Sequence, residues 1–193
     1  PEYLTIFNGQ TGAAMQTVDY DPGRGDTTTW GKTSDKTNRV DRFLACTAYL
    51  DGVHPSLVTA RGYYGKAIVV AYDWDGKNLN KRWRCDSTVS GYGSLAGQGN
   101  HNVSVADLDG DGCDEIVYGS AAIDNDGTVA HSTGWGHGDA IHVSDFNNDG
   151  KQEIFGVLEE KPNWGTGFRD AAGKEIWHFK ASGDDGRGVM DYF

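Results

Sequence analysis

The sequence has no long hydrophobic run, few cysteines and a shortage of positive charge. No apolar stretch approaches the roughly 18 residues that a membrane-spanning helix requires, which argues against a membrane partner. The chain has 17 Lys and Arg residues and 28 Asp and Glu residues, which gives a formal net charge of −11. This balance argues against nucleic-acid binding, which needs an excess of Lys and Arg. It suits metal cations, because clustered carboxylates repel one another less once a cation binds.

Cysteine is too scarce to support a disulfide framework or a thiolate metal site. The three residues Cys46, Cys85 and Cys113 allow at most one internal disulfide, and none of them lies in a CxxC pair. The sequence also lacks the phosphate-binding, serine-hydrolase and zinc-protease motifs. We therefore expect the cysteines to be structural or incidental.

Glycine, in contrast, is abundant, and it separates short apolar runs. The chain has 28 glycines, many of them in Asp-Gly or Asn-Gly turns between runs such as AIVVAY, EIVYG and EIFGV. Runs of four to eight residues that are rich in Val, Ile and Tyr and bounded by turns are typical of β-strands. No long stretch repeats apolar residues at helical spacing. The sequence predicts an all-β fold.

An internal repeat narrows the fold to a β-propeller. One element is strand, acidic turn and strand: it occurs as VSVADLDGDGCDEIVYG, as IHVSDFNNDGKQEIFGV and, with most acidic positions lost, as TAYLDGVHPSLVTARG. A second element is a hairpin with a Gly turn, as in VVAYDWDGKNLNKRW. The two elements alternate, and four antiparallel strands repeated every ~40–50 residues are typical of a propeller blade.

The repeats divide residues 1–193, which we expect to form one partial propeller domain, into about three blades. The predicted units cover roughly 1–37, 38–98, 99–136 and 137–186, and a further blade starts at 187–193. Propellers close with ~4–8 blades. We therefore expect either a piece of a larger propeller or chains that associate with one another to cover open blade edges.

The acidic turns predict two calcium sites that clip neighbouring strands together. Asp or Asn at positions 1, 3 and 5, a sharp Gly turn, a carbonyl at position 7 and Glu at position 9 supply the oxygen ligands that Ca²⁺ prefers. An EF-hand is excluded, since position 12 is Tyr118 or Gly156 and strands flank both loops. The alternative is a plain Asp/Gly turn. The predicted ligands are Asp107, Asp109, Asp111, Cys113 and Glu115 in one loop, and Asp145, Asn147, Asp149, Lys151 and Glu153 in the other.

A second set of polar residues enters the same strands from the opposite end. His101, His137 and Arg187 each lie four to eight residues before the first acidic position of successive units. The inner strands of a propeller run alongside one another, so these residues should converge at one end of the propeller, which we call the mouth. Two imidazoles and a guanidinium suit proton abstraction beside a carboxylate. The alternative is that each is a turn residue bonded to backbone.

Other residues could join the mouth. The second strand of each unit returns to it, carrying Arg61, Ser120 and Glu159, and Arg42 precedes the degenerate copy. We expect Arg42 and Arg61 to contact substrate. Trp135, in a Gly-rich loop, could stack on a sugar, although packing within the blade is the alternative.

These residues lie in segments that resemble a known family. The segments RVDRFLACTAYLDGVHPSLVTARGYYGKAIVVAYDWDGKNL, QGNHNVSVADLDGDGCDEIVYGSAAIDNDG and HSTGWGHGDAIHVSDFNNDG look like the rhamnogalacturonan lyases of polysaccharide lyase family 11. The resemblance covers most of the chain. It implies an eight-bladed propeller with many calcium ions, and a secreted, extracellular enzyme.

The resemblance also implies an activity and its residues. The family cleaves the rhamnogalacturonan I backbone of pectin by β-elimination between rhamnose and galacturonic acid. His101, His137 and Arg187 match residues of its catalytic cleft, and Asp139 and Glu159 match positions expected near a cation. Either histidine could be the base. A non-catalytic, calcium-stabilised propeller segment for carbohydrate binding or adhesion is the competing interpretation.

Overall fold

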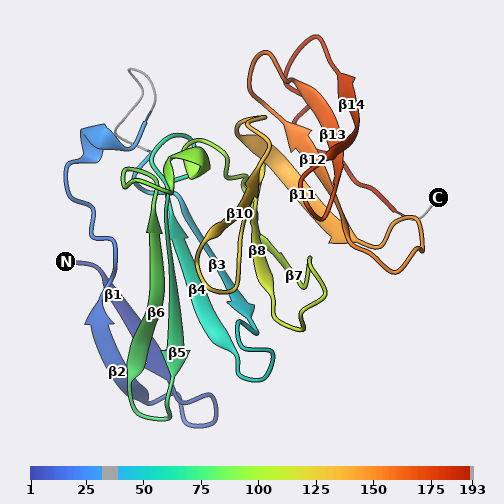
Figure 1. Ribbon diagram of the computed structural model, residues 1–193. Coiled ribbons are helices and arrows are strands. Elements are labelled where there is room, and N and C mark those ends of the chain that lie inside the picture. The colour runs from blue at the N-terminus through green and yellow to red at the C-terminus, as the bar shows by residue number, and fades with distance from the viewer. Residues whose placement is uncertain (32–38, 192–193) are drawn as a thin grey trace.

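The protein is an all-β partial propeller in the computed structural model, which describes residues 1–31 and 39–191 (Figure 1). Within these residues the strands form one two-stranded and three four-stranded antiparallel sheets. Two short 3₁₀ helices, η1 (Thr27–Thr29) and η2 (Gly93–Leu95), lie in the connections. No helix in the described part of the chain is long and apolar enough to cross a membrane.

Each four-stranded sheet is built from four strands that are consecutive in the sequence, so each sheet is one blade. The N-terminal hairpin pairs β1 (Tyr3–Phe7) with β2 (Ala14–Asp19). Blade one contains β3 (Phe43–Ala48), β4 (Ser56–Arg61), β5 (Ile68–Trp74) and β6 (Leu79–Asp86). Blade two contains β7 (Ser104–Ala106), β8 (Glu115–Tyr118), β9 (Ala121–Ile123) and β10 (Val129–Ser132). Blade three contains β11 (Gly138–Ser144), β12 (Glu153–Leu158), β13 (Gly165–Asp170) and β14 (Glu175–Lys180).

These sheets confirm the predicted fold class. Each predicted four-strand unit contains one blade, and the hairpin lies in the unit predicted for 1–37. The predicted boundary between residues 37 and 38 lies outside the described residues, as do the last two residues of the predicted unit 187–193.

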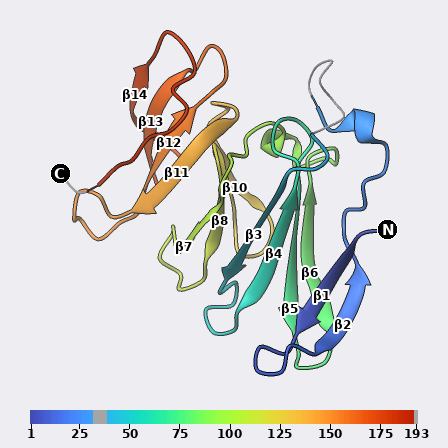
Figure 2. The ribbon, with the colours of Figure 1, turned by 180° about the vertical axis from the view of Figure 1, so that it is seen from behind.

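The blades meet through their first strands, as in a propeller. β7 contacts both β3 and β11, and Asn100 forms a parallel bridge with Gly138. The Asn102 side chain accepts a hydrogen bond from the Ile141 N–H at 3.1 Å and donates one to the Ile141 carbonyl at 3.0 Å. Both ribbon views show the three blades following one another across the molecule, with blade two between blades one and three (Figures 1 and 2). The first strands therefore begin at one shared end.

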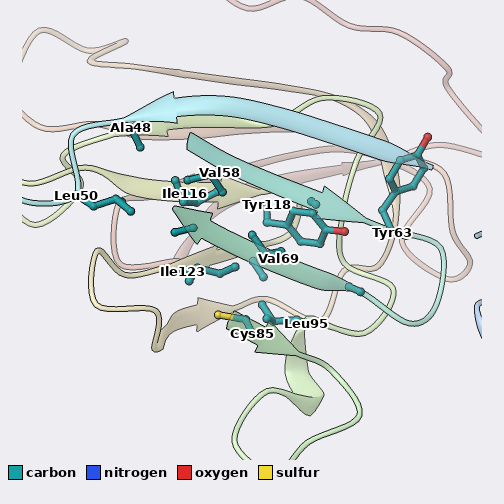
Figure 3. Packing of buried hydrophobic residues seen from close by; sticks show 14 residues of the cluster. Ala48, Leu50, Val58, Tyr63, Val69, Cys85, Leu95, Ile116, Tyr118 and Ile123 are labelled. Carbon is teal, nitrogen blue, oxygen red and sulfur yellow. The ribbon is translucent and has the colours of Figure 1, made fainter. Parts of the chain in front are cut away.

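The hydrophobic core lies between the sheets, because each blade buries one face against the next. The largest cluster joins blade one to blade two through Val58, Val69, Ile116, Tyr118 and Ile123 (Figure 3). A smaller cluster of Val117, Ile141 and Ile154 joins blade two to blade three. The three cysteines are free, and Cys85 lies fully buried within the larger cluster. This agrees with the structural or incidental role expected for them.

Candidate functional site

Four polar side chains meet at the mouth, between blades two and three. His101 precedes β7, His137 immediately precedes β11, Asp139 lies within β11, and Glu159 follows β12. The acidic loop of blade two begins directly after β7, so His101 and Asp107 lie at opposite ends of one strand. The predicted separation of the mouth from the loops is therefore present in the fold.

The four side chains lie close enough to share one ligand. His137 Nε2 lies 3.1 Å from Glu159 Oε2 and 3.3 Å from His101 Nε2, and His101 Nε2 lies 3.2 Å from Asp139 Oδ1. One donor atom from each residue falls within 4.8 Å of all the others. Two imidazole nitrogens and two carboxylate oxygens are a donor set that fits a divalent cation.

Hydrogen bonding fixes which nitrogen of His137 faces the cluster. The Nδ1 atom lies 2.5 Å from the Gly99 carbonyl, which can only accept, so we assign the proton to Nδ1. Neutral His137 then presents the Nε2 lone pair to the Glu159 carboxylate and to His101. Two lone pairs that face each other repel unless a proton or a cation lies between them, so the buried His137 ring (0% exposed) is poised to ligate.

Burial shifts the ionisation of two members of the cluster. Desolvation lowers the pKa of His101 below its usual 6.5, and the Arg187, Arg42 and Arg39 guanidiniums add to this effect. The pKa of the Glu159 carboxyl is raised, mainly by desolvation and then by the neighbouring Asp139 charge. A neutral His101 can accept a proton or ligate a cation.

Two tyrosines that the sequence analysis missed complete the surroundings of His101. The Tyr63 hydroxyl lies 3.2 Å from His101 Nδ1, and the Tyr64 hydroxyl lies 3.1 Å from His101 Nε2. The Tyr63 ring also stacks on His137, with centroids 5.3 Å apart. Both tyrosines follow the degenerate repeat copy, and they enter the mouth from blade one. Three blades therefore contribute to one site.

A cationic rim borders the cluster. Arg187 Nη1 donates to the Asp139 carbonyl at 2.9 Å and lies 3.5 Å from Asp139 Oδ1, while the side chain stays 72% exposed. The Arg39 guanidinium lies over the Tyr64 ring at 3.7 Å, and that of Arg42 lies 5.9 Å from the same ring. The sequence predicted Arg187 and Arg42 near the mouth but not Arg39. The rim is suited to anionic ligands.

Arg61 is placed differently from the expectation that it contacts substrate. The side chain is 0% exposed, and its two terminal nitrogens each lie 2.7 Å from one carboxylate oxygen of Glu2. It also donates to the carbonyls of Val40 and Pro22. The strand registers make Arg61 in β4 the equivalent of Leu158 in β12. Glu159, which reaches the mouth, is one residue further along its chain. Strand side chains alternate between faces, so Arg61 points away from the mouth.

Trp135 also differs from its expected role. The residue is 8% exposed, and its ring fills the space over Gly167, where an added Cβ would meet the ring at 2.4 Å. Its ring centroid lies 5.3 Å from that of His178. This placement agrees with the packing role given as the alternative for this residue, with the ring set against blade three, and it does not agree with stacking on a sugar.

The two acidic loops share one arrangement. In each, the position 9 carboxylate accepts the N–H of position 2: Glu115 from Leu108 at 2.6 Å, and Glu153 from Phe146 at 2.9 Å. Donor atoms of Asp107, Asp109 and Glu115 lie within 4.8 Å of one another, as do those of Asp145, Asp149 and Glu153. The backbone therefore aims three carboxylates of each loop at a single point.

Glu115 is the loop carboxylate whose surroundings most favour a bound cation. The residue is 2% exposed, and its Oε1 atom has no hydrogen-bond partner. Burial, together with the charges of Asp109, Asp124 and Asp111, raises its pKa to about 7. A buried carboxylate oxygen without a partner is costly, and a bound cation removes that cost. The loop residues fit Ca²⁺, with Asn147, Asp111 and the carbonyls of Cys113 and Lys151 as the remaining predicted ligands.

Comparison with known proteins identifies the family. Residues 1–192 match the family described as "Rhamnogalacturonan lyase family 11, C-terminal domain". The chain is 54% identical to rhamnogalacturonan exolyase YesX and 51% identical to rhamnogalacturonan endolyase YesW, both of Bacillus subtilis, over 98% of its own length. It spans about 31% of the length of each relative.

Solved structures agree with the sequence match. The crystal structure of exotype rhamnogalacturonan lyase YesX superposes with a TM-score of 0.92 at 52% identity, over 97% of this chain and 31% of that one. The rhamnogalacturonan lyase of Bacillus licheniformis gives a TM-score of 0.91 at 52% identity, over 97% of this chain and 32% of that one. The resemblance noted in the sequence is thereby confirmed, and the chain belongs to rhamnogalacturonan lyase family 11.

Proposed function

We propose that the protein acts in a secreted rhamnogalacturonan lyase, which cleaves rhamnose–galacturonate linkages of pectin by cation-dependent β-elimination. The observation that carries this proposal is the meeting of His101, His137, Asp139 and Glu159 beside Arg187 at the mouth. The names of the relatives support the substrate class. The acidic loops of blades two and three are proposed as calcium sites that stabilise the fold.

We assign His137, Asp139 and Glu159 to the cation at the mouth. His137 is fully buried, its Nε2 lies 3.1 Å from Glu159 Oε2, and the ligand atoms of His137, Asp139 and Glu159 lie within 4.8 Å of one another. Three protein ligands leave coordination positions open, as catalytic metal sites require. When bound, the cation supplies positive charge for a galacturonate carboxylate, which makes the neighbouring C5 proton more acidic. Arg187, largely exposed beside Asp139, binds the same class of carboxylate.

His101 is assigned to proton removal. Its side chain is 29% exposed, so it reaches the open side of the cluster, and its lowered pKa keeps the ring neutral at pH 7. His101 Nε2 takes the C5 proton, and the C–H electron pair forms the C4–C5 double bond. The C4–O bond breaks, its electron pair leaves on the glycosidic oxygen, and that oxygen takes a proton from water. The hydroxyls of Tyr63 and Tyr64 hold the ring in place.

The test combines product formation with metal analysis. Incubation with rhamnogalacturonan I and calcium should produce the ultraviolet absorbance of an unsaturated uronate. His137→Ala should lose both the absorbance and the cation at the mouth, whereas His101→Ala should lose the absorbance and keep the cation. If His101→Ala also loses the cation, His101 is a ligand and the base lies elsewhere.

The competing function is a non-catalytic carbohydrate-binding segment. Calorimetric binding of the polysaccharide without any absorbance rise would favour it, and neither binding nor absorbance would contradict both functions. The mouth favours the lyase, because carbohydrate binding alone has no use for two imidazoles beside two carboxylates. Self-association of chains across open blade edges remains part of the proposal.

A further inference from the structure

The three blades share one structural corner at the end that carries the acidic loops. In each blade the second strand begins with a buried residue: Ser56, Glu115 or Glu153. Its partner on the third strand is acidic, since Ser56 pairs with Asp73 and Glu153 pairs with Asp170. In blade two, the Ile116–Ile123 pair sets Asp124 beside Glu115.

The fourth strand of each blade adds one extra residue at the same place in this corner. The register shifts between Lys81 and Trp83 in β6, between Val129 and His131 in β10, and between Glu175 and Trp177 in β14. The extra residues are Arg82, Ala130 and Ile176. A β-bulge re-aims a side chain, so these three residues are structural counterparts.

In blade one, Arg82 occupies the acidic corner. Its Nε lies 3.1 and 3.0 Å from the two carboxylate oxygens of Asp73, and Nη2 lies 3.9 Å from Asp51. Asp73 also accepts from the Ser56 hydroxyl at 2.6 Å. Asp51 is the third residue after β3, as Asp109 is after β7, so it corresponds to the position 3 ligand.

In blades two and three, the corner is open and strongly acidic. Ala130 and Ile176 line a cavity of about 670 Å³ between these blades. The carboxylates of Asp109, Glu115 and Asp124 border it, together with those of Asp149, Glu153 and Asp170. The buried and unpartnered Glu115 Oε1 belongs to one of these lining residues. Arg82 of blade one thus corresponds to the uncharged residues Ala130 and Ile176 in the two blades whose corners hold the most carboxylates.

We propose that Arg82 takes the place of a divalent cation in blade one, so that this blade is closed without calcium while blades two and three depend on it. Blade one retains two carboxylates, Asp51 and Asp73, which a single guanidinium neutralises in part. In this proposal, Asp124 in the corner of blade two and Asp170 in the corner of blade three each supply a further carboxylate toward the calcium ion of that blade. The inference rests on the proposed calcium loops for blades two and three, but not for blade one.

Arg82→Met tests the substitution in blade one. The variant keeps most of the side-chain length and removes the charge, so the melting temperature should fall by about 2–4 °C. The fall should be equal in calcium and in chelator, and Arg82→Lys should restore part of it. A fall that calcium reverses, or no fall at all, would overturn the role of Arg82.

Ala130→Arg tests the equivalence of the corners directly. The new guanidinium should displace the ion of blade two, so the full chain should bind one calcium ion fewer by elemental analysis. Its melting temperature should also drop less on chelation than that of the natural protein. Ala130→Gln, similar in shape but uncharged, should keep the ion.

Different results would contradict the role of the Arg82 corner and the proposed calcium loops. An Ala130→Arg chain that keeps every ion and its full sensitivity to chelator would contradict the equivalence of the corners. A natural protein that binds no calcium would contradict the loops themselves, and the Arg82→Met melt would still decide whether Arg82 stabilises blade one.

Discussion

His101 holds contacts through both ring nitrogens, and this sets its orientation at the mouth. Tyr63 contacts Nδ1, while Tyr64, His137 and Asp139 surround Nε2. A hydroxyl that bonds Nδ1 fixes the ring plane and leaves Nε2 to the chemistry. Tyr63 is therefore a positioning residue of the proposed lyase rather than a substrate contact.

Tyr63→Phe should reduce kcat/KM by roughly fivefold, because the hydrogen bond it removes contributes about 1 kcal/mol. The ring stack on His137 is retained, so the melting temperature should change little. Steady-state kinetics with rhamnogalacturonan I would measure the effect. Tyr49→Phe serves as the control, because Tyr49 is exposed and directly follows β3, at the end opposite the mouth. Unchanged kcat/KM in the Tyr63 variant would refute the positioning role.

The pH dependence of the proposed lyase should reflect the lowered pKa of His101. Desolvation disfavours the charged imidazolium, so the ring stays neutral to a lower pH than an exposed histidine. We expect the acid limb of kcat/KM to lie below pH 6.5, the ordinary histidine value. A limb above pH 6.5 would assign the proton acceptor to another group.

The residue pattern predicted the partners at the mouth but not their full surroundings. His101 and His137 were found because they repeat at one register in two similar units. Tyr63 and Tyr64 could not be found this way, since the repeat in blade one has lost its acidic positions. The sequence analysis aligned Arg61 with Glu159, whereas its structural equivalent is Leu158, one residue earlier. Because side chains alternate along a strand, this shift of one residue places Arg61 on the opposite face.

A buried guanidinium is one of the contacts that tie the N-terminal hairpin to blade one, beside the hydrogen bond from the Leu79 N–H to Gln16 Oε1 at 2.6 Å. Arg61 joins Glu2 to the carbonyls of Val40 and Pro22, so segments far apart in the sequence converge on one side chain. Removal of Glu2 leaves the buried guanidinium with Asp41, whose Oδ1 lies 3.7 Å from Arg61 Nη2, as its remaining carboxylate partner, so part of the charge compensation is lost. Figures 1 and 2 show the hairpin lying beside β5 and β6, at the outer side of this blade.

Glu2→Ala should therefore destabilise the attachment of β1 and β2 by roughly 2 kcal/mol, less than the loss of a fully buried ion pair because the Glu2 side chain is 33% exposed. Hydrogen exchange should show the amides of this hairpin losing protection before those of β4 and β5. Glu2→Gln keeps an acceptor for Arg61 and should cost less. Equal loss of protection in every sheet would show that the hairpin unfolds together with the blades.

His131 couples the packing of blades two and three to pH. Its Nε2 atom is buried without a hydrogen-bond partner, and its ring packs where a Cβ on Gly173 would lie. Burial, assisted by the Arg169 charge, lowers the pKa of His131 to about 4. Below the unfolded value of 6.5 the unfolded chain binds the extra proton, so stability falls as the pH drops from 6.5 towards 4.

His131→Gln should flatten this part of the pH dependence. The natural protein should lose up to roughly 3 kcal/mol of unfolding free energy between pH 6.5 and pH 4 through this group. Urea unfolding at several pH values would measure the difference between the two chains. Identical slopes would show that other groups control acid stability.

At the scale of the whole molecule, the blade order could be predicted because every blade repeats one strand pattern. The number of blades per chain followed from the acidic turns and Gly hairpins, and the structure confirms it. The sequence could not predict which sheet faces are exposed. A strand shows the same alternation of apolar residues whether its apolar face is covered or open to solvent. β14 illustrates this, since Ile176, Trp177 and Phe179 are 50%, 38% and 68% exposed.

The exposed face of β14 predicts self-association of this chain. It is the last strand of its sheet, and an unpaired edge with large apolar side chains attracts a second copy. Sedimentation should show a mass above 20.9 kDa that rises with concentration. Phe179→Lys should return the mass to that of one chain without lowering the melting temperature, whereas Val53→Lys, on the exposed turn after β3, should leave the association unchanged. A single-chain mass at every concentration would show that this face has no affinity for itself.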